Sequence, residues 1–367
     1  MDTAFSKEIQ LMRYLLLTII AIGFTFSAQA QDRLFSQTYS APLTLNPALT
    51  GAFDGKFRVS GIYRNQWNGI LEQPFQTYST ALDFKFGVGK GYKKKDLAGA
   101  GILFYTDKVG ELDFSTTKIA VSGAFHKALD QRSQQYLSAG FQMGIVQRNI
   151  NYSSVTFQDQ FNGLTGFNDP TAEDLPENNF AFGDASVGLN YAYTPAARTS
   201  LFVGVGVHHF LTPSVSFYDR NDALGIYDED PLDIKYTLQV SGSLPLGQNL
   251  SILPRFIGAY QGSHLKVDAG TNFRIGLGEL QKFALHIGGY ARVVANETEI
   301  AGSAAVTPSA FSVPTAVVLL GIEYSNILFG FSYDLNLKDV ALGQNAFEIS
   351  VAYLGEYEDD LLLCPKF

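Results

Sequence analysis

Apolar and polar side chains alternate with a period of two along most of this chain. In the clearest segment, residues 234–244, one face of a strand would carry Ile234, Tyr236, Leu238, Val240, Gly242 and Leu244. Lysine, threonine, glutamine and serine occupy the positions between them. Because successive side chains of a strand point to opposite faces, this alternation predicts strands with one apolar and one polar face.

About 14 segments of this kind follow one another, and an even number is typical of bacterial outer-membrane barrels. They lie near residues 57–67, 75–87, 97–107, 113–128, 134–148, 180–194, 199–210, 233–244, 249–260, 263–276, 283–292, 315–325, 326–336 and 344–356. With both chain ends in the periplasm, the connections after odd-numbered strands face outward and can be long. The three longest gaps, 149–179, 211–232 and 293–314, follow the fifth, seventh and eleventh segments, as this arrangement requires.

Residues 1–30 are typical of a secretory signal peptide. Met12-Arg13 gives a basic start, Tyr14 to Phe26 form an apolar run, and Ala28-Gln29-Ala30 fits a small-x-small cleavage site. Two acidic residues precede Met12, which is therefore an alternative initiator. The apolar run is shorter than the roughly 20 residues that a membrane-spanning helix needs. We expect export, cleavage before Gln31, and no lipid anchor there because Gln31 is not a cysteine.

Composition narrows the class of protein further. No other apolar run approaches the roughly 20 residues of a spanning helix, which excludes a helical inner-membrane protein. Glycine (35), phenylalanine (29) and tyrosine (19) are abundant, as strands, tight turns and aromatic girdles require. The net charge of −9 argues against a nucleic-acid partner, and a single cysteine leaves no internal disulfide. A soluble sandwich would show the same alternation within one strand, but the signal, the length and the repetition favour a barrel.

The predicted fold is therefore all-β: a transmembrane antiparallel outer-membrane β-barrel over residues 57–356, with a periplasmic tail at 357–367. An irregular segment, residues 31–56, precedes it; Pro42 and Pro47 disfavour a regular strand or helix there. Its apolar side chains need a place to pack. Two placements remain open: a plug inside the lumen, which a barrel of this size can hold, and a cap across the periplasmic mouth.

Several motifs resemble those of the PorP/SprF family of the type IX secretion system, found in gliding and secreting Gram-negative bacteria. They cover essentially the whole mature chain: DRLFSQ (32–37), APLTLNPALTG (41–51), YRNQW (63–67), GILFYTDK (101–108), FHKAL (125–129), VQR (146–148), FQDQ (157–160), KYTL (235–238), GFSYDLN (330–336), FEIS (347–350) and the closing CPKF (364–367). The combination of NPAL, YRNQW and a terminal CPxF in this order is the specific part of the resemblance.

The resemblance implies a non-enzymatic barrel that works with the secretion apparatus in the outer membrane. Its implied partners are secreted cargo proteins with a C-terminal sorting domain, periplasmic components linked to peptidoglycan, and outer-membrane lipid. It implies no cofactor. Two alternatives from other classes remain open: a transporter of hydrophobic small molecules of the fatty-acid type, and a porin.

Candidate partner-binding and lumen residues come from the motifs and from the inward face of the strands. In YRNQW, Tyr63 and Trp67 fit an outer aromatic girdle, and Arg64 and Gln66 point to the lumen. The inward charges have both signs, which predicts a neutralised polar network rather than an ion-selective ring. The candidates are Phe35, Asn46, Pro47, Arg64, Gln66, Trp67, Arg148, Lys235, Asp334, Cys364 and Phe367.

The two C-terminal candidates have two readings. Cys364 and Phe367 belong either to a projecting periplasmic tail used for docking or to an aromatic C-terminus that serves barrel assembly.

Motifs for catalysis are lacking. No G-x-S-x-G occurs, and His126 and His286 fall on polar strand faces as lumen lining. His208 and His209 are adjacent in a predicted strand, so we expect their rings on opposite faces, unable to bind one metal together. Acidic residues 228–230 with Asp233, and Glu173-Asp174, lie in predicted outer loops, where solvation is the default and Ca²⁺ binding an alternative.

Overall fold

The computed structural model describes residues 34–69, 71–89, 96–110, 113–163, 166–173, 175–217, 231–262, 264–278, 282–295, 311–337 and 345–355. The predicted signal peptide and the predicted tail with Cys364 and Phe367 lie outside these residues. Within them, no helix has the length and hydropathy to cross a membrane.

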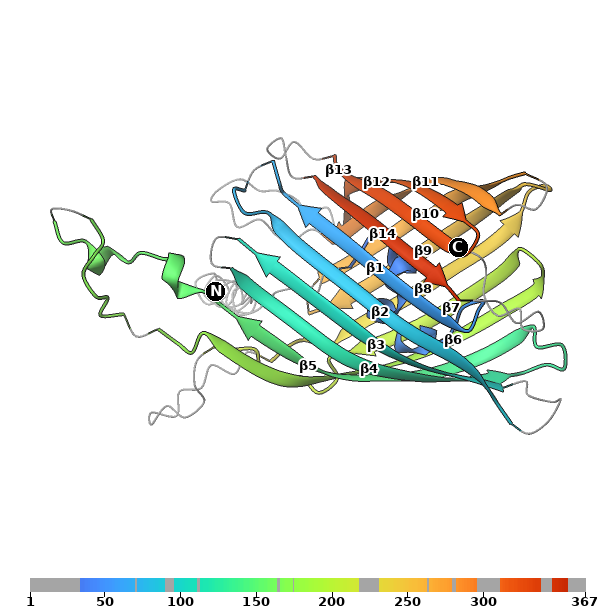
Figure 1. Cartoon of the computed structure of the whole chain (residues 1–367), viewed down its shortest axis with the longest axis horizontal. Helices are drawn as coiled ribbons and strands as arrows, with labels where there is room; N and C mark the ends of the chain where they lie inside the picture. Colours follow the sequence, from blue (N-terminus) through green and yellow to red (C-terminus); the bar gives the residue numbers. More distant parts are fainter. Residues whose placement is uncertain are drawn as a thin grey trace, which may run out of the picture. The chain divides into compact units, whose positions relative to one another are not determined.

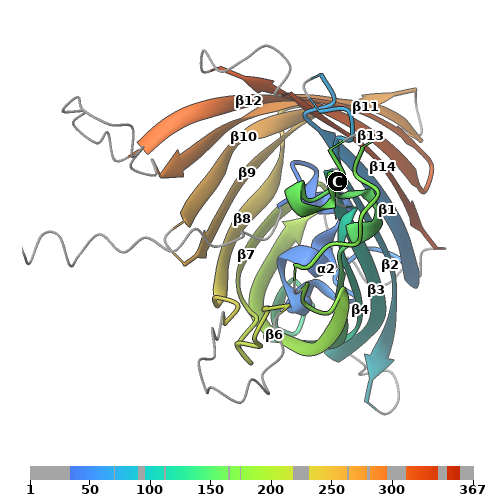
Figure 2. The ribbon, with the colours of Figure 1, turned by 90° about the vertical axis from the view of Figure 1, so that its left-hand side faces the viewer.

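Fourteen strands form one closed antiparallel barrel in which each strand pairs with its neighbours in sequence and β1 pairs with β14 (Figures 1 and 2). They are β1 (Phe57–Gln66), β2 (Phe75–Val88), β3 (Asp96–Val109), β4 (Phe114–Ala128), β5 (Gln135–Asn149), β6 (Asn179–Ala196), β7 (Thr199–His208), β8 (Lys235–Pro245), β9 (Leu250–Gln261), β10 (His264–Leu277), β11 (Phe283–Ala295), β12 (Phe311–Tyr324), β13 (Ile327–Asn336) and β14 (Ala346–Leu354). The predicted fold class is confirmed. The β1–β14 register sets Arg64 opposite Glu348, and this pairing closes the sheet.

The period-two pattern of the sequence separates the two faces of the wall. On β5, Phe141, Met143 and Ile145 are exposed on the outer surface, whereas Ser138 and Gln142 are buried inside the barrel. A lipid-facing apolar band with a polar interior is the arrangement that a membrane barrel needs. The buried face is therefore the polar one, the reverse of a soluble sandwich.

Aromatic side chains cluster near both ends of β1 on the outer surface. The rings of Tyr63 and Tyr78 lie 4.7 Å apart, and Trp67 lies 4.7 Å from Phe75 just beyond the strand. At the other end, Phe57 packs against Phe84. Such clusters at the two rims are the girdles by which barrels sit in the membrane interfaces.

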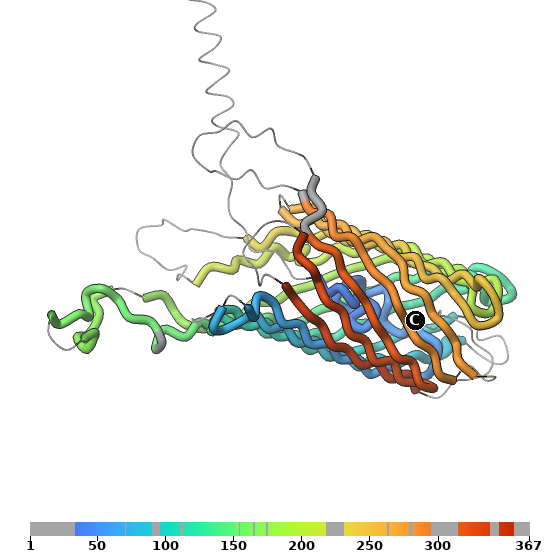
Figure 3. Tube along the Cα trace, turned by 90° about the horizontal axis from the view of Figure 1, so that it is seen from above, coloured from blue at the N-terminus to red at the C-terminus, as the bar shows by residue number. Residues whose placement is uncertain are grey.

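The segment before β1 lies inside the barrel, as Figures 2 and 3 show. It consists of three single turns of helix joined by extended residues: η1 (Thr38–Ser40), α2 (Pro42–Leu45) and η2 (Pro47–Leu49). Pro42 and Pro47 each occupy the first position of a turn, where proline is tolerated because the missing N–H would have no partner there. Residues 34–56, called the plug from here on, thus fill the lumen rather than cap its mouth.

The connections sort by length as predicted. Those after β5, β7 and β11 are long, while β12 and β13 are joined by Ser325 and Asn326 alone. The loop after β5 carries η4 (Tyr152–Ser154) and η5 (Gln158–Gln160) and extends beyond the strand ends in Figure 1. Because short turns face the periplasm in bacterial barrels, this loop is expected on the outside of the cell.

Single-cysteine labelling tests this orientation. In a Cys364→Ser background, we expect a membrane-impermeant maleimide to label Asn168→Cys, in the loop after β5, in intact cells. We expect Gly247→Cys, in the turn after β8, to react only after the outer membrane is permeabilised. The reverse pattern would contradict the orientation.

Candidate functional site

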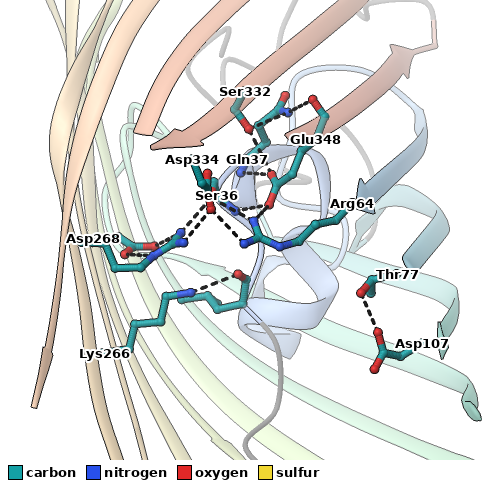
Figure 4. A network of polar contacts seen from close by, with 12 residues as sticks. Ser36, Gln37, Arg64, Thr77, Asp107, Lys266, Asp268, Ser332, Asp334 and Glu348 are labelled. Carbon is teal, nitrogen blue, oxygen red and sulfur yellow. Dashed lines mark hydrogen bonds and ion pairs between the residues drawn. The ribbon is translucent and has the colours of Figure 1, made fainter. Parts of the chain in front are cut away.

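The most extensive polar network of the lumen joins the start of the plug to β1, β10, β11, β13 and β14 (Figure 4). Arg64 forms ion pairs with Glu348 and, at 2.8 Å, with Asp334. Arg292 bridges Asp334 at 2.7 Å and Asp268 at 2.8 Å. All five side chains are buried. Each carboxylate has an arginine partner, which offsets the large cost of burying charge.

The plug is held by the same carboxylates. The backbone N–H groups of Ser36 and Gln37 donate to the two oxygens of Glu348 at 2.8 and 2.9 Å. The Ser36 hydroxyl donates to Asp334, and Lys266 Nζ donates to the Leu34 carbonyl at 3.2 Å. Three basic side chains (Arg64, Arg292, Lys266) and three acidic ones (Asp268, Asp334, Glu348) make up this cluster, called the clamp. The inward charges of both signs thus meet in one network.

The NPAL sequence explains how the middle of the plug attaches to the opposite wall. Asn46 Oδ1 accepts a hydrogen bond from the Ala48 N–H at 2.9 Å and so caps η2. Its Nδ2 donates to the carbonyls of Leu189 on β6 and Val205 on β7, at 3.0 and 3.2 Å. Asn46 therefore both starts a helical turn and ties it to two strands.

The end of the plug is held near the start of β1 by a second buried ion pair. Arg58 Nη2 lies 2.7 Å from Asp83 Oδ2, and the Gly51 N–H donates to the same carboxylate at 2.8 Å. His126 on β4 contacts the Thr50 carbonyl through Nε2 at 2.9 Å. Gly51 has a φ of 74°, a left-handed conformation that favours glycine and reverses the chain here.

Glycines on the inward face provide room for the plug backbone. A Cβ at Gly140 would overlap the backbone of Ala48, and one at Gly188 would overlap the Asn46 side chain. At Gly99 the clash would be with the Thr50 carbonyl. Three strands thus carry glycine where the plug approaches closest, so part of the glycine content of the chain forms the seat of the plug.

The sequence-predicted residues that the structure describes lie in several different parts of the barrel. Arg64 and Asp334 meet in the clamp, and Phe35, Asn46 and Pro47 are buried in the plug. Lys235 is buried on the inner face of β8, while Gln66 is half-buried at the end of β1 and Trp67 belongs to the outer girdle. Arg148 donates to the Val215 carbonyl at 3.3 Å, away from the plug.

Sequence reasoning missed several clamp and seat residues, although a signal existed for some of them. Arg58 and Asp83, and likewise Asp268 and Arg292, are direct neighbours on adjacent antiparallel strands. Pairing each predicted hairpin through its turn would have brought these opposite charges together. Nothing in the sequence shows that Ser36 and Gln37 meet Glu348.

The prediction that the rings of His208 and His209 lie on opposite faces was wrong. Both rings are buried, and His209 Nδ1 lies 2.9 Å from Asp184, which also pairs with Lys118 at 2.6 Å. The reason is that β7 ends at His208 and His209 has a φ of 59°, so the strand alternation no longer applies. Among the described residues, no group of three or more His, Cys, Asp and Glu side chains could hold a metal ion. The acidic residues 228–230 lie outside the described residues.

The outer loop after β5 has an organising carboxylate of its own. Asp159 accepts hydrogen bonds from the Ala172 N–H at 2.6 Å and from the Thr171 hydroxyl at 2.9 Å. The Ala172 N–H above all lowers the pKa of Asp159, since it stabilises the carboxylate. The loop also pairs Phe161 with Phe167, whose rings lie 5.3 Å apart. The FQDQ motif thus shapes this loop.

These observations define an outer-membrane β-barrel whose lumen holds the segment before β1 in a largely buried clamp of ion pairs. Residues 27–353 match the family described as type IX secretion system membrane protein PorP/SprF, and the chain belongs to that family. No curated protein matches it.

Several solved outer-membrane channels resemble the chain weakly. The CymD monoaromatic hydrocarbon channel is 12% identical, with a TM-score of 0.48 and coverage of 90% of this chain and 95% of that one. The P. putida toluene transporter TodX is 12% identical (TM-score 0.45, coverage 85% and 93%). A Pseudomonas aeruginosa FadL homologue is 11% identical (TM-score 0.47, coverage 86% and 93%). These likenesses are too weak to assign a substrate to this chain.

The clamp predicts a specific pattern of stability changes. Arg64→Met leaves two buried carboxylates with fewer cationic partners, which should cost about 3–5 kcal/mol in the free energy of unfolding. In the double variant Arg64→Met/Glu348→Gln both charges are removed, so the loss should be smaller. Urea unfolding of the barrel in detergent would measure both.

Lys127→Met is the matched control, because it breaks the exposed Lys127–Asp96 ion pair. Its cost should stay below about 1 kcal/mol. An Arg64→Met variant as stable as this control would contradict the clamp.

The glycine seat predicts position-dependent effects. Gly188→Leu should displace the plug, because the added side chain takes the place of the Asn46 amide. We expect a protease added to the purified barrel to cut within residues 34–56 of this variant and not of the wild type. Gly183→Leu on the same strand has open space around its Cβ and should behave like the wild type. Equal resistance of all three proteins would refute the seat.

The resistance of the loop after β5 to proteolysis should depend on the charge of Asp159. Because folding lowers its pKa, the carboxylate stabilises the loop above the ordinary pKa of about 4, and this stabilisation is lost as the pH falls through the lowered value. Loop cleavage by an added protease should thus be constant from neutral pH to about 5 and rise below about 4. At neutral pH, Asp159→Asn should be cut faster than Asp169→Asn; equal rates would argue against this role.

Proposed function

We propose that this protein is a non-enzymatic accessory of the type IX secretion system that binds secreted cargo through its outer loops. The cargo class is a protein with a C-terminal sorting domain, which the barrel helps to export or to retain at the surface. On the opposite side, the periplasmic tail meets components linked to peptidoglycan. The lipid-facing band keeps the barrel in the outer membrane.

The exposed tip of the loop after β5 is the observation that carries this proposal. The side chains of Phe161 and Phe167 are 53% and 49% exposed, although their rings pack on each other. Large exposed aromatic side chains on a structured loop outside the lipid band are typical of protein-binding sites. Five acidic residues lie in the same loop: Asp159, Asp169, Glu173, Asp174 and Glu177. The complementary partner surface is apolar with a basic rim.

The filled lumen supports binding rather than passage. The plug crosses the lumen from the clamp to the Arg58–Asp83 pair and contacts wall residues on β1, β2, β4, β6, β7, β8, β10, β13 and β14. Because the plug occupies this path, a cargo would meet the loops first. The porin and the hydrophobic-compound transporter both need a route through this region.

Affinity purification of tagged protein from native outer membranes tests the proposal. We expect mass spectrometry to find a surface protein with a C-terminal sorting domain, together with type IX periplasmic components. Phe161→Ser/Phe167→Ser should lose the cargo and keep the periplasmic components. Leu211→Ser, an exposed apolar residue in the loop after β7, is the control and should keep both.

Conductance separates the alternatives. Purified wild-type protein in planar bilayers should be silent, because the plug fills the lumen. Steady conductance would favour the porin. A barrel that purifies alone and carries only a small apolar ligand would favour the transporter.

A further inference from the structure

A cavity of about 100 Å³ lies between the plug and the wall formed by β7, β8 and β9. Arg58, Gly242 and Leu253, close to the strand ends that bear the short turns, lie at its periplasmic side. The lining residues used below are Leu45 and Leu49 of the plug and Gln239, Leu253, Arg255 and Ile257 of the wall. This cavity takes no part in the clamp, and its interpretation does not depend on the proposed function.

Arg255 is the unusual residue of this cavity. It lies on the inner face of β9 between the buried Leu253 and Ile257, and its guanidinium stacks on the Tyr39 ring, 5.0 Å from the ring centre. Its Nη1 is buried and has no hydrogen-bond partner among the described residues. The side chain as a whole is half-buried. A guanidinium that loses part of its water without gaining a counter-ion is costly.

The other arginines of the inner wall that approach the plug are paired. Arg58 bonds to Asp83, Arg64 to Glu348, and Arg292 to Asp268. Arg274 likewise forms a two-pronged contact with Glu323, at 2.7 and 2.8 Å. Unlike these four arginines, Arg255 has no carboxylate partner among the described residues, which leaves a place for an external one.

A second unsatisfied atom belongs to another residue that lines this cavity. Gln239 is buried, its Nε2 donates to Asn190 Oδ1 at 3.2 Å, and its Oε1 has no donor among the described residues. A buried acceptor without a donor also costs free energy, and a ligand N–H or O–H would satisfy it. Leu45, Leu49, Leu253 and Ile257 form the apolar remainder of the lining.

We propose that this cavity binds a small apolar carboxylic acid that carries a hydrogen-bond donor next to its carboxylate. The carboxylate accepts from Arg255, the donor meets Gln239 Oε1, and a short branched hydrocarbon group packs on the leucines and Ile257. An engineered cavity of about 150 Å³ holds one benzene, so this smaller cavity encloses only a few heavy atoms and the rest of the ligand extends beyond it. A free hydroxy or amino acid and the C-terminal residue of a peptide share this chemistry.

Calorimetric titration of the purified full barrel in detergent tests the site with matched probes. The probes are 2-hydroxy-3-methylbutanoate, its carboxamide, which lacks the charge, and 3-methylbutanoate, which lacks the donor. We expect 2-hydroxy-3-methylbutanoate to bind. The carboxamide should bind about tenfold or more weakly, and 3-methylbutanoate should lose less affinity than the carboxamide. The tripeptide Gly-Gly-Val tests whether the ligand is the C-terminal residue of a peptide. If it binds more tightly than 2-hydroxy-3-methylbutanoate, the site is assigned to a peptide C-terminus.

Two variants locate the binding. Arg255→Gln should lower the affinity for 2-hydroxy-3-methylbutanoate by about tenfold or more, because a charged hydrogen bond is lost. The control Arg132→Gln, in the exposed turn after β4, should leave this affinity unchanged. Gln239→Leu should abolish the preference for the hydroxy acid over 3-methylbutanoate. A difference in gel migration between heated and unheated samples would show that each variant barrel is folded. Wild-type protein that binds none of the four probes, or Arg255→Gln that binds like the wild type, would overturn the proposal.

Discussion

The burial of charge in the lumen is the constraint on which the rest of this structure depends. A barrel of fourteen strands encloses more space than its own side chains fill, and whatever enters brings backbone N–H and C=O groups that need partners. The chain meets this need by lining the wall with carboxylates that accept from the plug backbone, as Glu348 does from Ser36 and Gln37. The arginines then neutralise the carboxylates, so that plug, wall and charge network form one unit.

The family motifs acquire a common physical meaning in this light. DRLFSQ contributes Ser36 and Gln37, YRNQW contributes Arg64, and FEIS contributes Glu348, all of which meet in the clamp. NPAL contacts the wall through Asn46, and FHKAL contacts the plug through His126. Motifs separated by hundreds of residues in the sequence are thus parts of one interface. The loop after β5 is organised separately, by Asp159.

The sequence predicted the wall better than its contents. Period two determined the strands and the inward face of Arg64, Asp334 and Glu348, because strand geometry leaves two directions for a side chain. The plug has no regular secondary structure, so no sequence period predicts its path. Its partners depend on which inward-facing side chains lie at the same level along the barrel axis. His209 shows the limit within the wall: one residue with left-handed φ past the end of β7 turned its ring inward. The sequence could not predict the role of Arg255 for a similar reason. Whether an arginine has a carboxylate partner depends on the side chains around it in the folded barrel.

Hydrogen exchange of the folded barrel in detergent tests the central claim that the plug is a fixed part of the lumen. The backbone N–H groups of Ser36, Gln37, Ala48 and Gly51 donate to buried side-chain oxygens. They should therefore exchange as slowly as those of the strands, and faster in Arg64→Met. Rapid exchange of residues 34–51 while the strands stay protected would contradict the account, because it would mean that the plug leaves its seat without unfolding the barrel.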